Sequence, residues 1–122
     1  MDEAAGIKLS SRIIHSGKVF TAVTDYIQLP TGRKVDLDII RHKQSVILLP
    51  MPDSDHIILV RQYRYAINQW IWELPAGNVE DDEHPDNAAR RECAEETGQA
   101  PSCIERLGAY FPTPGYCDEE ML

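Results

Sequence analysis

The spacing of apolar and polar residues predicts strands for most of the first half of the chain. Residues 11–29, SRIIHSGKVFTAVTDYIQL, read as short strands with a turn at Ser16 and Gly17. The segment PTGRK is typical of a hairpin turn, and the following VDLDIIRH alternates apolar and polar residues. The continuous apolar run SVILLP then fits a buried strand. We therefore predict mostly antiparallel β-structure for this half.

The pattern becomes less regular after residue 56. IILVRQYRYA predicts another strand, and WIWELPAG places Trp70 and Trp72 on one strand face with Ile71 on the other. Two interpretations of the tryptophans stay open, namely packing in the core or an interface, and stacking of a ligand base. Further on, IERLGAYF predicts a strand, and PTPGY predicts a rigid loop.

One helix is predicted between these parts. The polar stretch NVEDDEHPDN reads as a loop, and Pro85 suits the first turn of a helix. The helical pattern runs to about Thr97. Gly98 is then well suited to end the helix in the left-handed conformation.

The length, net charge and cysteines of the chain exclude some classes of function. A chain of 122 residues suits one domain, and its net charge of −8 argues against binding to nucleic-acid backbones. Acidity does not exclude a phosphorylated ligand, because bound cations can bridge the two. Cys93, Cys103 and Cys117 form no CxxC pair, so we expect reduced thiols and a cytoplasmic protein. We expect neither a signal peptide nor a membrane span.

The predicted helix carries three glutamates whose mutual repulsion needs a compensating charge. With Glu92 at zero on a helical wheel, Glu96 falls about 40° to one side and Glu95 about 60° to the other. Glu92 and Glu96 thus lie within the stripe of small apolar residues expected to face the protein. Arg91 stands four residues before Glu95 and can pair with it, which leaves Glu92 and Glu96 without a local partner.

Carboxylates placed against a protein body need a cation or paired arginines. Oxygen ligands favour hard cations, so we favour a Mg²⁺ or Mn²⁺ site over a merely acidic helix. The preceding loop supports this interpretation. Gly77 permits a close backbone approach, and its neighbours can offer carbonyl oxygens to an ion. Asp81 and Asp82 are expected to be solvated turn residues.

The same residues resemble the Nudix box. The sequence has Gly77, five residues, Glu83, seven residues and then RECAEETG, which supplies Arg91, Glu92, Glu95, Glu96 and Gly98 at the box spacing. Cys93 fills the first apolar position, whereas Gln99 stands where the box has an aliphatic residue. LVRQYRYA, WELPAG and PTPGYCDE further resemble the ADP-ribose pyrophosphatase branch, with Pro114 about sixteen residues beyond the box.

The resemblance implies a fold and a division of the chain. The fold would be an α/β/α sandwich with a mixed sheet and a β-rich N-terminal part. Residues 1–40 would form N-terminal strands for dimerisation, and residues 41–122 would form the hydrolase domain. The C-terminal strands and closing helix of the family would be missing from the chain, which we therefore expect to be truncated. A partner subunit, forming a homodimer, would cover the face left open.

The resemblance also implies an activity, which is metal-dependent hydrolysis of a nucleoside diphosphate linked to another moiety. ADP-ribose, cleaved to AMP and ribose 5-phosphate, is the first candidate. The implied metal ligands are Glu92 and Glu96, with Glu95 assisting and the Ala76 carbonyl adding an oxygen. Arg91 would orient the glutamates, and Glu83 would join them in catalysis. The positions that would contact substrate are Arg64, Glu73, Gly77 and Pro114.

Two other functions remain open at this stage. The first is hydrolysis of another substrate, such as a nucleotide sugar or a dinucleoside polyphosphate. The second is a weakly active or silent nucleotide-binding module, because the chain is short.

Overall fold

A computed structural model describes residues 3–122, which fall into two compact units. The first unit contains the described residues up to Lys43 together with Phe111–Glu119. The second contains Gln44–Tyr110 and Glu120–Leu122. The first unit therefore ends at Lys43 in the N-terminal part of the chain and also includes the later loop Phe111–Glu119. The boundary after residue 40 stays a prediction.

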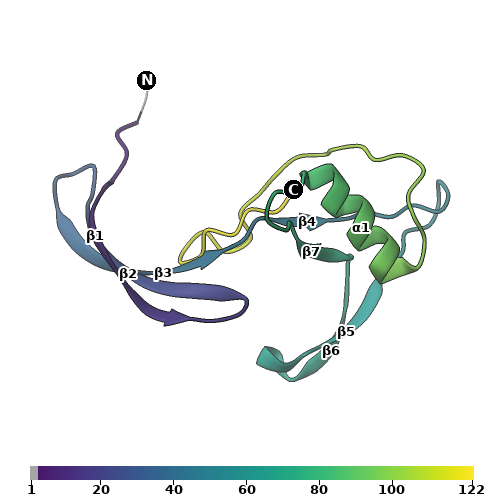
Figure 1. The fold of residues 1–122 in the computed structure, drawn as a ribbon, viewed down its shortest axis with the longest axis horizontal. Coiled ribbons are helices and arrows are strands. Elements are labelled where there is room, and N and C mark those ends of the chain that lie inside the picture. Colours follow the sequence, from purple (N-terminus) through teal and green to yellow (C-terminus); the bar gives the residue numbers. More distant parts are fainter. Residues whose placement is uncertain (1–2) are drawn as a thin grey trace. The chain divides into compact units, whose positions relative to one another are not determined.

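The first unit is built on a three-stranded antiparallel sheet in the order β1-β2-β3 (Figure 1). Its strands are β1 (Ile7–Ser16), β2 (Phe20–Gln28) and β3 (Lys34–His42). The predicted turns are confirmed, because Gly17 and Gly32 lie in the two connections between strands. In the second turn the Gly32 amide donates to the Leu29 carbonyl at 2.8 Å. Every residue of β1 is exposed, whereas β2 carries the buried positions of the sheet.

The second unit has short strands on which the helix packs. β4 (Ser45–Ile47) pairs antiparallel with β7 (Ala76–Asn78), and Met121 forms a parallel bridge with Ser45. The expected mixed pairing is thus present around β4. The apolar run SVILLP begins as predicted, but the strand ends at Ile47 rather than continuing to residue 50.

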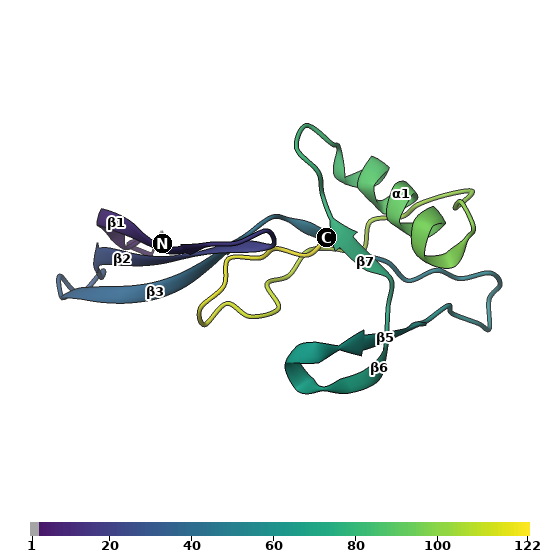
Figure 2. The same ribbon diagram turned by 60° about the horizontal axis from the view of Figure 1, so that its bottom comes forward.

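A separate hairpin contains the tryptophans (Figure 2). It consists of β5 (Val60–Arg64), a 3₁₀ turn (Tyr65–Ile67) and β6 (Gln69–Glu73), so the predicted strand over residues 57–66 is shorter than expected. Trp70 and Trp72 share one face as predicted, but they are 60% and 66% exposed. Core packing is therefore the wrong interpretation for both. Neither an interface nor base stacking is tested.

Helix α1 (Pro85–Thr97) confirms the sequence prediction at both ends. His84 precedes Pro85, and its Nδ1 accepts a hydrogen bond from the Asp86 amide at 3.2 Å. At the other end Gly98 has a φ of 74°, and its amide donates to the Ala94 carbonyl at 3.0 Å. The cap residues thus satisfy backbone groups that the helix leaves open.

The small core of the second unit lies between this helix and β4. Ala88, Ala89 and Val46 are its buried members, and a further set of apolar side chains packs around them in partly buried positions. That set consists of Leu48, Val79, Ile104 and Leu122. The small side chains of Ala88 and Ala89 let α1 pack closely on β4.

The strand predicted for residues 104–111 is absent. Within residues 3–122 this segment has no ladder, and only Tyr110 forms a bridge, with Met121. An extended apolar segment becomes a strand only where a neighbouring backbone offers a matching row of partners. Here Met121 alone does so. The described residues also hold one α-helix, so they contain one helical layer of the expected sandwich.

The left-handed end of α1 can be tested by substitution. We expect Gly98→Ala to lower the free energy of unfolding by about 1 kcal/mol, because a β-carbon disfavours the left-handed conformation. No side-chain clash should add to this, since nothing lies within 4 Å of a β-carbon built there. Gly98→Asn is the matched control and should cost less. Equal losses for Ala and Asn in urea denaturation would contradict this explanation.

Candidate functional site

Glu92 lies against the backbone of β7 at Gly77. The side chain of Glu92 is buried, with 9% of the residue exposed. A β-carbon built on Gly77 would stand 2.0 Å from the Glu92 Cδ atom and 2.2 Å from its Oε1. Only glycine therefore leaves room for the carboxylate here. The prediction that Gly77 permits a close approach is confirmed, and the approaching group is Glu92 itself.

The carbonyl of Ala76 points away from β4. In the ladder the Leu48 amide donates to the Pro75 carbonyl at 2.9 Å. The backbone groups of antiparallel strands alternate in direction, so those of Ala76 face the opposite edge. Asn78 has the same orientation as Ala76, and its carbonyl accepts a hydrogen bond from Arg91 Nη2 at 3.0 Å. The Ala76 carbonyl thus faces the side of β7 on which Arg91 binds.

Arg91 joins the glutamates to one another. Its Nε and Nη2 donate to the two oxygens of Glu83 at 2.9 and 3.0 Å, and its Nη1 donates to Glu92 Oε1 at 2.7 Å. The predicted contact with Glu95 exists, but it is longer at 3.4 Å. The expectation that Glu92 has no local partner is therefore wrong. Helical spacing could not reveal this pair, because neighbouring residues on a helix do not normally face each other.

The charges of this network shift the pKa values of its members. The Arg91 guanidinium, assisted by the Glu80 amide, lowers the pKa of Glu83 to about 2. In turn Glu83, and then Glu92, raise the pKa of Arg91 above its ordinary value. Both groups therefore stay charged across the physiological range.

Glu96 has the opposite character. It is partly buried, and the structure gives it no hydrogen bond or ion pair with any residue in 3–122. Burial, followed by the charge of Glu92, raises the pKa of Glu96. A carboxylate that is desolvated beside another carboxylate favours a cation. The expectation that Glu96 lacks a local partner is therefore confirmed for the described residues.

The residues expected to contact substrate lie in both units. Arg64 forms a bidentate pair with Glu73, at 2.8 and 2.7 Å, and this pairing raises the pKa of Arg64. Both residues line a cavity of about 320 Å³ together with Ala76. The charge of Arg64 lowers the pKa of Glu96 and that of Glu73 raises it, so this pair interacts electrostatically with the helix glutamate. Pro114 lies instead in the loop that belongs to the first unit.

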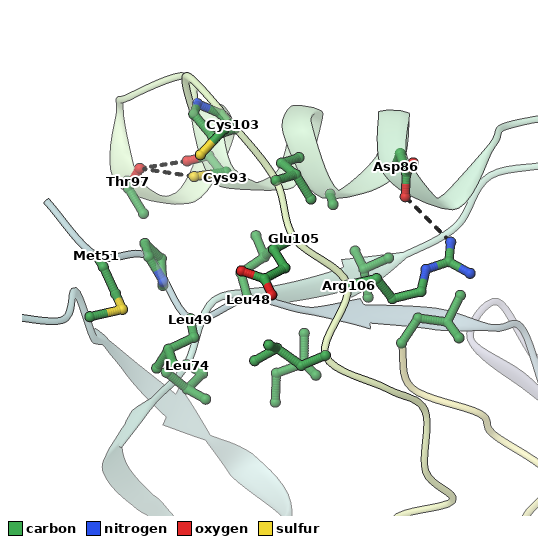
Figure 3. A pocket seen from close by; sticks show the side chains of 18 of the residues that line it. Leu48, Leu49, Met51, Leu74, Asp86, Cys93, Thr97, Cys103, Glu105 and Arg106 are labelled. Atoms are coloured by element: carbon green, nitrogen blue, oxygen red, sulfur yellow. Dashed lines mark hydrogen bonds and ion pairs between the residues drawn. The ribbon is translucent and has the colours of Figure 1, made fainter.

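A larger cavity, of about 870 Å³, borders a different face of α1 (Figure 3). Cys93 and Thr97 of the helix face it, across from Leu48, Leu49 and Leu74. Its wall is mostly apolar and contains none of the glutamates Glu92, Glu95 and Glu96. Size therefore does not identify the candidate site, whose chemistry depends on the carboxylates.

The donors at α1 fit a hard divalent cation in their chemistry. Glu92 and Glu96 offer carboxylate oxygens, and the Ala76 carbonyl faces outward beside the Glu92–Gly77 contact. Within residues 3–122, however, no three His, Cys, Asp or Glu side chains are gathered closely enough to hold an ion as they stand. Side-chain movement of Glu96 or Glu95 would be needed to complete a coordination shell.

The depressed pKa of Glu83 predicts a specific pH dependence. The unfolded carboxyl titrates near its ordinary value of 4.5, whereas the folded one titrates at about 2. The Glu83–Arg91 pair therefore stabilises the fold fully above pH 4.5 and progressively less as the pH falls toward 2.

Thermal unfolding of wild type and Glu83→Gln between pH 7 and pH 2 should show this loss. We expect the difference in Tm between the two proteins to be constant at neutral pH and to shrink steadily from about pH 4.5 toward pH 2. A difference as large at pH 2 as at pH 7 would contradict the assignment.

The arrangement around α1 agrees with what comparisons with known proteins found. A model of the NUDIX domain matches residues 41–122. An ADP-ribose pyrophosphatase of Bacillus subtilis (strain 168) is 36% identical over 106 residues, which are 87% of this chain and 57% of that protein. An ADP-ribose pyrophosphatase of Mycobacterium tuberculosis is 33% identical over 114 residues, 93% of this chain and 55% of that protein.

A further relative has a different name, and a solved structure has a similar fold at low sequence identity to this chain. A CMP-5'-(N-acetyl-N-hydroxy-3-aminopropyl)phosphonate hydrolase of Streptomyces rubellomurinus is 32% identical over 107 residues, 88% of this chain and 52% of that protein. The crystal structure of an ADP compounds hydrolase has a TM-score of 0.83 and 21% identity, covering 99% of this chain and 66% of that one. The chain spans about half the length of the curated relatives it matches. With the box residues and the fold in agreement, the chain belongs to the Nudix family.

Proposed function

We propose that this chain contributes the catalytic centre of a metal-dependent hydrolase of nucleoside diphosphates linked to another moiety. The supporting observation is Glu96, a partly buried carboxylate beside Glu92 that forms no hydrogen bond or ion pair with residues 3–122 and whose pKa is raised despite the nearby charge of Arg64. Such a group is unfavourable by itself and becomes favourable when a divalent cation binds. The cation would in turn attract a diphosphate, which the acidic surface would otherwise repel.

The residues would divide the work as follows. Glu92 and Glu96 hold Mg²⁺, or Mn²⁺, with the Ala76 carbonyl as a further ligand and Glu95 assisting. Bound Mg²⁺ would polarise phosphoryl oxygens and lower the pKa of an attacking water. Arg91 keeps Glu92 oriented against β7 through its 2.7 Å hydrogen bond. Glu83 takes part by holding Arg91 in place.

The substrate would be bound by groups beyond the helix. The Arg64 guanidinium has the geometry to bind a phosphate or a carboxylate in a bidentate manner. Glu73 orients that guanidinium in the structure and offers oxygens to sugar hydroxyls. Gly77, which leaves room for the Glu92 carboxylate, and Pro114 are the two further positions that we propose to contact the substrate. ADP-ribose is the first candidate substrate, because two of the relatives carry the name ADP-ribose pyrophosphatase.

A substrate panel tests the proposal. We expect Mg²⁺-dependent release of AMP and ribose 5-phosphate from ADP-ribose, with slower turnover of nucleotide sugars and dinucleoside polyphosphates. Product identification by chromatography distinguishes these cases. Faster turnover of another panel member would replace ADP-ribose as substrate, whereas binding without turnover would favour a silent nucleotide-binding module.

Two helix variants test the metal ligands. We expect Glu92→Gln and Glu96→Gln each to lower kcat by at least about 100-fold, since each removes a ligand of the ion that stabilises the transition state. Without metal, Glu96→Gln should raise Tm by about 2 °C, because it removes a repulsion of roughly 0.5 kcal/mol. Glu105→Gln, an exposed acid of the same unit, is the control and should change neither quantity. Near-normal turnover of the two helix variants would refute the assignment.

We further propose that the chain forms a homodimer through its N-terminal strands and works in the cytoplasm. Every residue of β1 is exposed, and among these residues Ile7, Ile13 and Ile14 are apolar and more than half exposed. Burial of this strand against a second copy would gain free energy. The free thiols of the three cysteines accord with a reducing compartment. No helix within residues 3–122 is sufficiently long and apolar to cross a membrane.

Light scattering tests the assembly. We expect twice the chain mass at micromolar concentration. Ile13→Asp should shift the protein toward the monomer, because it places a charge in the apolar surface that we expect to be buried. A wild-type monomer under these conditions would rule out the proposed dimer.

A further inference from the structure

The smaller cavity of the second unit has one charged wall and one apolar wall. Its volume is about 320 Å³, at the lower end of the range for small-molecule sites. The charged wall is the ion pair between Arg64 and Glu73. The apolar wall consists of Ile47, Leu74, Ala76 and Met121. Such a lining suits one sugar ring, because its hydroxyls can both donate to a carboxylate and accept from a guanidinium, while its C–H groups pack on apolar atoms.

This cavity adjoins the proposed metal ligands. Ala76, whose carbonyl is the proposed further ligand of the ion, is one of its lining residues. Arg64 and Glu73 interact electrostatically with Glu96 of the helix. All of these residues belong to the second unit. A diphosphate held by an ion at Glu96 would therefore place one of its two substituents next to the cavity.

The side chain of Met121 is held in place by Tyr110. The two residues form an antiparallel bridge, in which the Met121 amide donates to the Tyr110 carbonyl at 2.8 Å and the Tyr110 amide donates to the Met121 carbonyl at 2.9 Å. The Tyr110 hydroxyl also donates to Met121 Sδ at 3.5 Å. A methionine side chain has three rotatable bonds and adapts to many shapes. This contact therefore favours one position of the thioether, with Met121 partly buried at the cavity wall.

The backbone around Met121 is fixed against β4. Met121 forms a parallel bridge with Ser45. The Ser45 amide donates to the Glu120 carbonyl at 2.9 Å, and the Leu122 amide donates to the Ser45 carbonyl at 3.0 Å. β4 in turn pairs with β7, which contains Ala76. Strand pairing therefore sets how far Met121 stands from the proposed carbonyl ligand.

We propose that Met121 is a specificity-determining residue, which closes the apolar side of this cavity and thereby restricts the sugar linked to the nucleoside diphosphate to a pentose. The sugar would place its hydroxyls against Arg64 and Glu73 and its C–H groups against Met121. A hexose is larger, and extra atoms against a packed wall cost binding free energy. Tyr110 acts through Met121 as a positioning residue. This inference rests on the proposed function, because it concerns the substrate of that same site.

Substitutions at Met121 and Tyr110 test this role. Met121→Ala opens the apolar wall, whereas Met121→Leu nearly keeps its volume and is the conservative variant. Tyr110→Phe removes the hydroxyl that contacts the thioether and retains the ring, so it provides a second test with little risk to the fold. Met51→Ala removes a 54% exposed methionine that lines the larger cavity instead, and is the matched control. Circular dichroism would first establish that each variant is folded.

The readout is the ratio of kcat/KM for ADP-ribose to kcat/KM for ADP-glucose, measured with Mg²⁺. For Met121→Ala we expect this sugar ratio to fall about tenfold, because the larger sugar gains room. Tyr110→Phe should lower it about threefold, since the thioether can then move aside. Met121→Leu and Met51→Ala should stay within about twofold of wild type. The corresponding ratio of ADP-ribose to IDP-ribose, which differ only in the base, should stay within about twofold of wild type in every variant.

The outcomes separate this inference from the function on which it rests. If wild type is active and the sugar ratio is unchanged in both Met121→Ala and Tyr110→Phe, the role of Met121 is overturned and the function stands. A change in the base ratio rather than the sugar ratio would overturn the assignment of the cavity to the sugar. If wild type hydrolyses none of the three compounds, the proposed function fails, and the role of Met121 falls with it.

Discussion

The guanidinium of Arg91 is the interaction on which the candidate site depends. One side chain neutralises Glu83, orients Glu92 and binds the Asn78 carbonyl, so it joins the loop before α1, the helix and β7. The bidentate contact with Glu83 determines where the guanidinium lies. Its remaining N–H groups then determine where Glu92 lies. The acidic helix can pack on a short sheet because the positively charged guanidinium of Arg91 lies where the helix meets β7.

The same arrangement leaves the charge at α1 incompletely balanced. Arg91 contacts three of the glutamates but not Glu96, whose pKa is raised by burial and by Glu92. A fold selected for stability alone would have little reason to keep such a carboxylate. The imbalance is a local cost that a bound ion would offset, and it makes the helix, rather than the larger apolar cavity, the chemically informative feature of the second unit.

The sequence predicted the local features well and the long-range ones less well. The limits of α1, both turns of the N-terminal sheet and the shared face of Trp70 and Trp72 followed from residue types with strong local preferences. The exposure of the tryptophans and the missing strand at residues 104–111 depend on which neighbours are present, and periodicity does not report neighbours. Asp25 shows the same limit, since no pattern in β2 indicates that this buried residue would form an ion pair with Arg41.

The contact between Gly77 and Glu92 restricts how these two positions can change over time. A β-carbon at residue 77 would occupy the space of the carboxylate, so any larger residue there requires a shorter or displaced side chain at residue 92. A shorter acid at residue 92 would in turn lose its reach to Arg91. Changing only residue 77 would therefore remove the room for the Glu92 carboxylate, and shortening only residue 92 would remove its hydrogen bond to Arg91. We expect divergence in this part of the molecule to proceed by joint replacement or not at all.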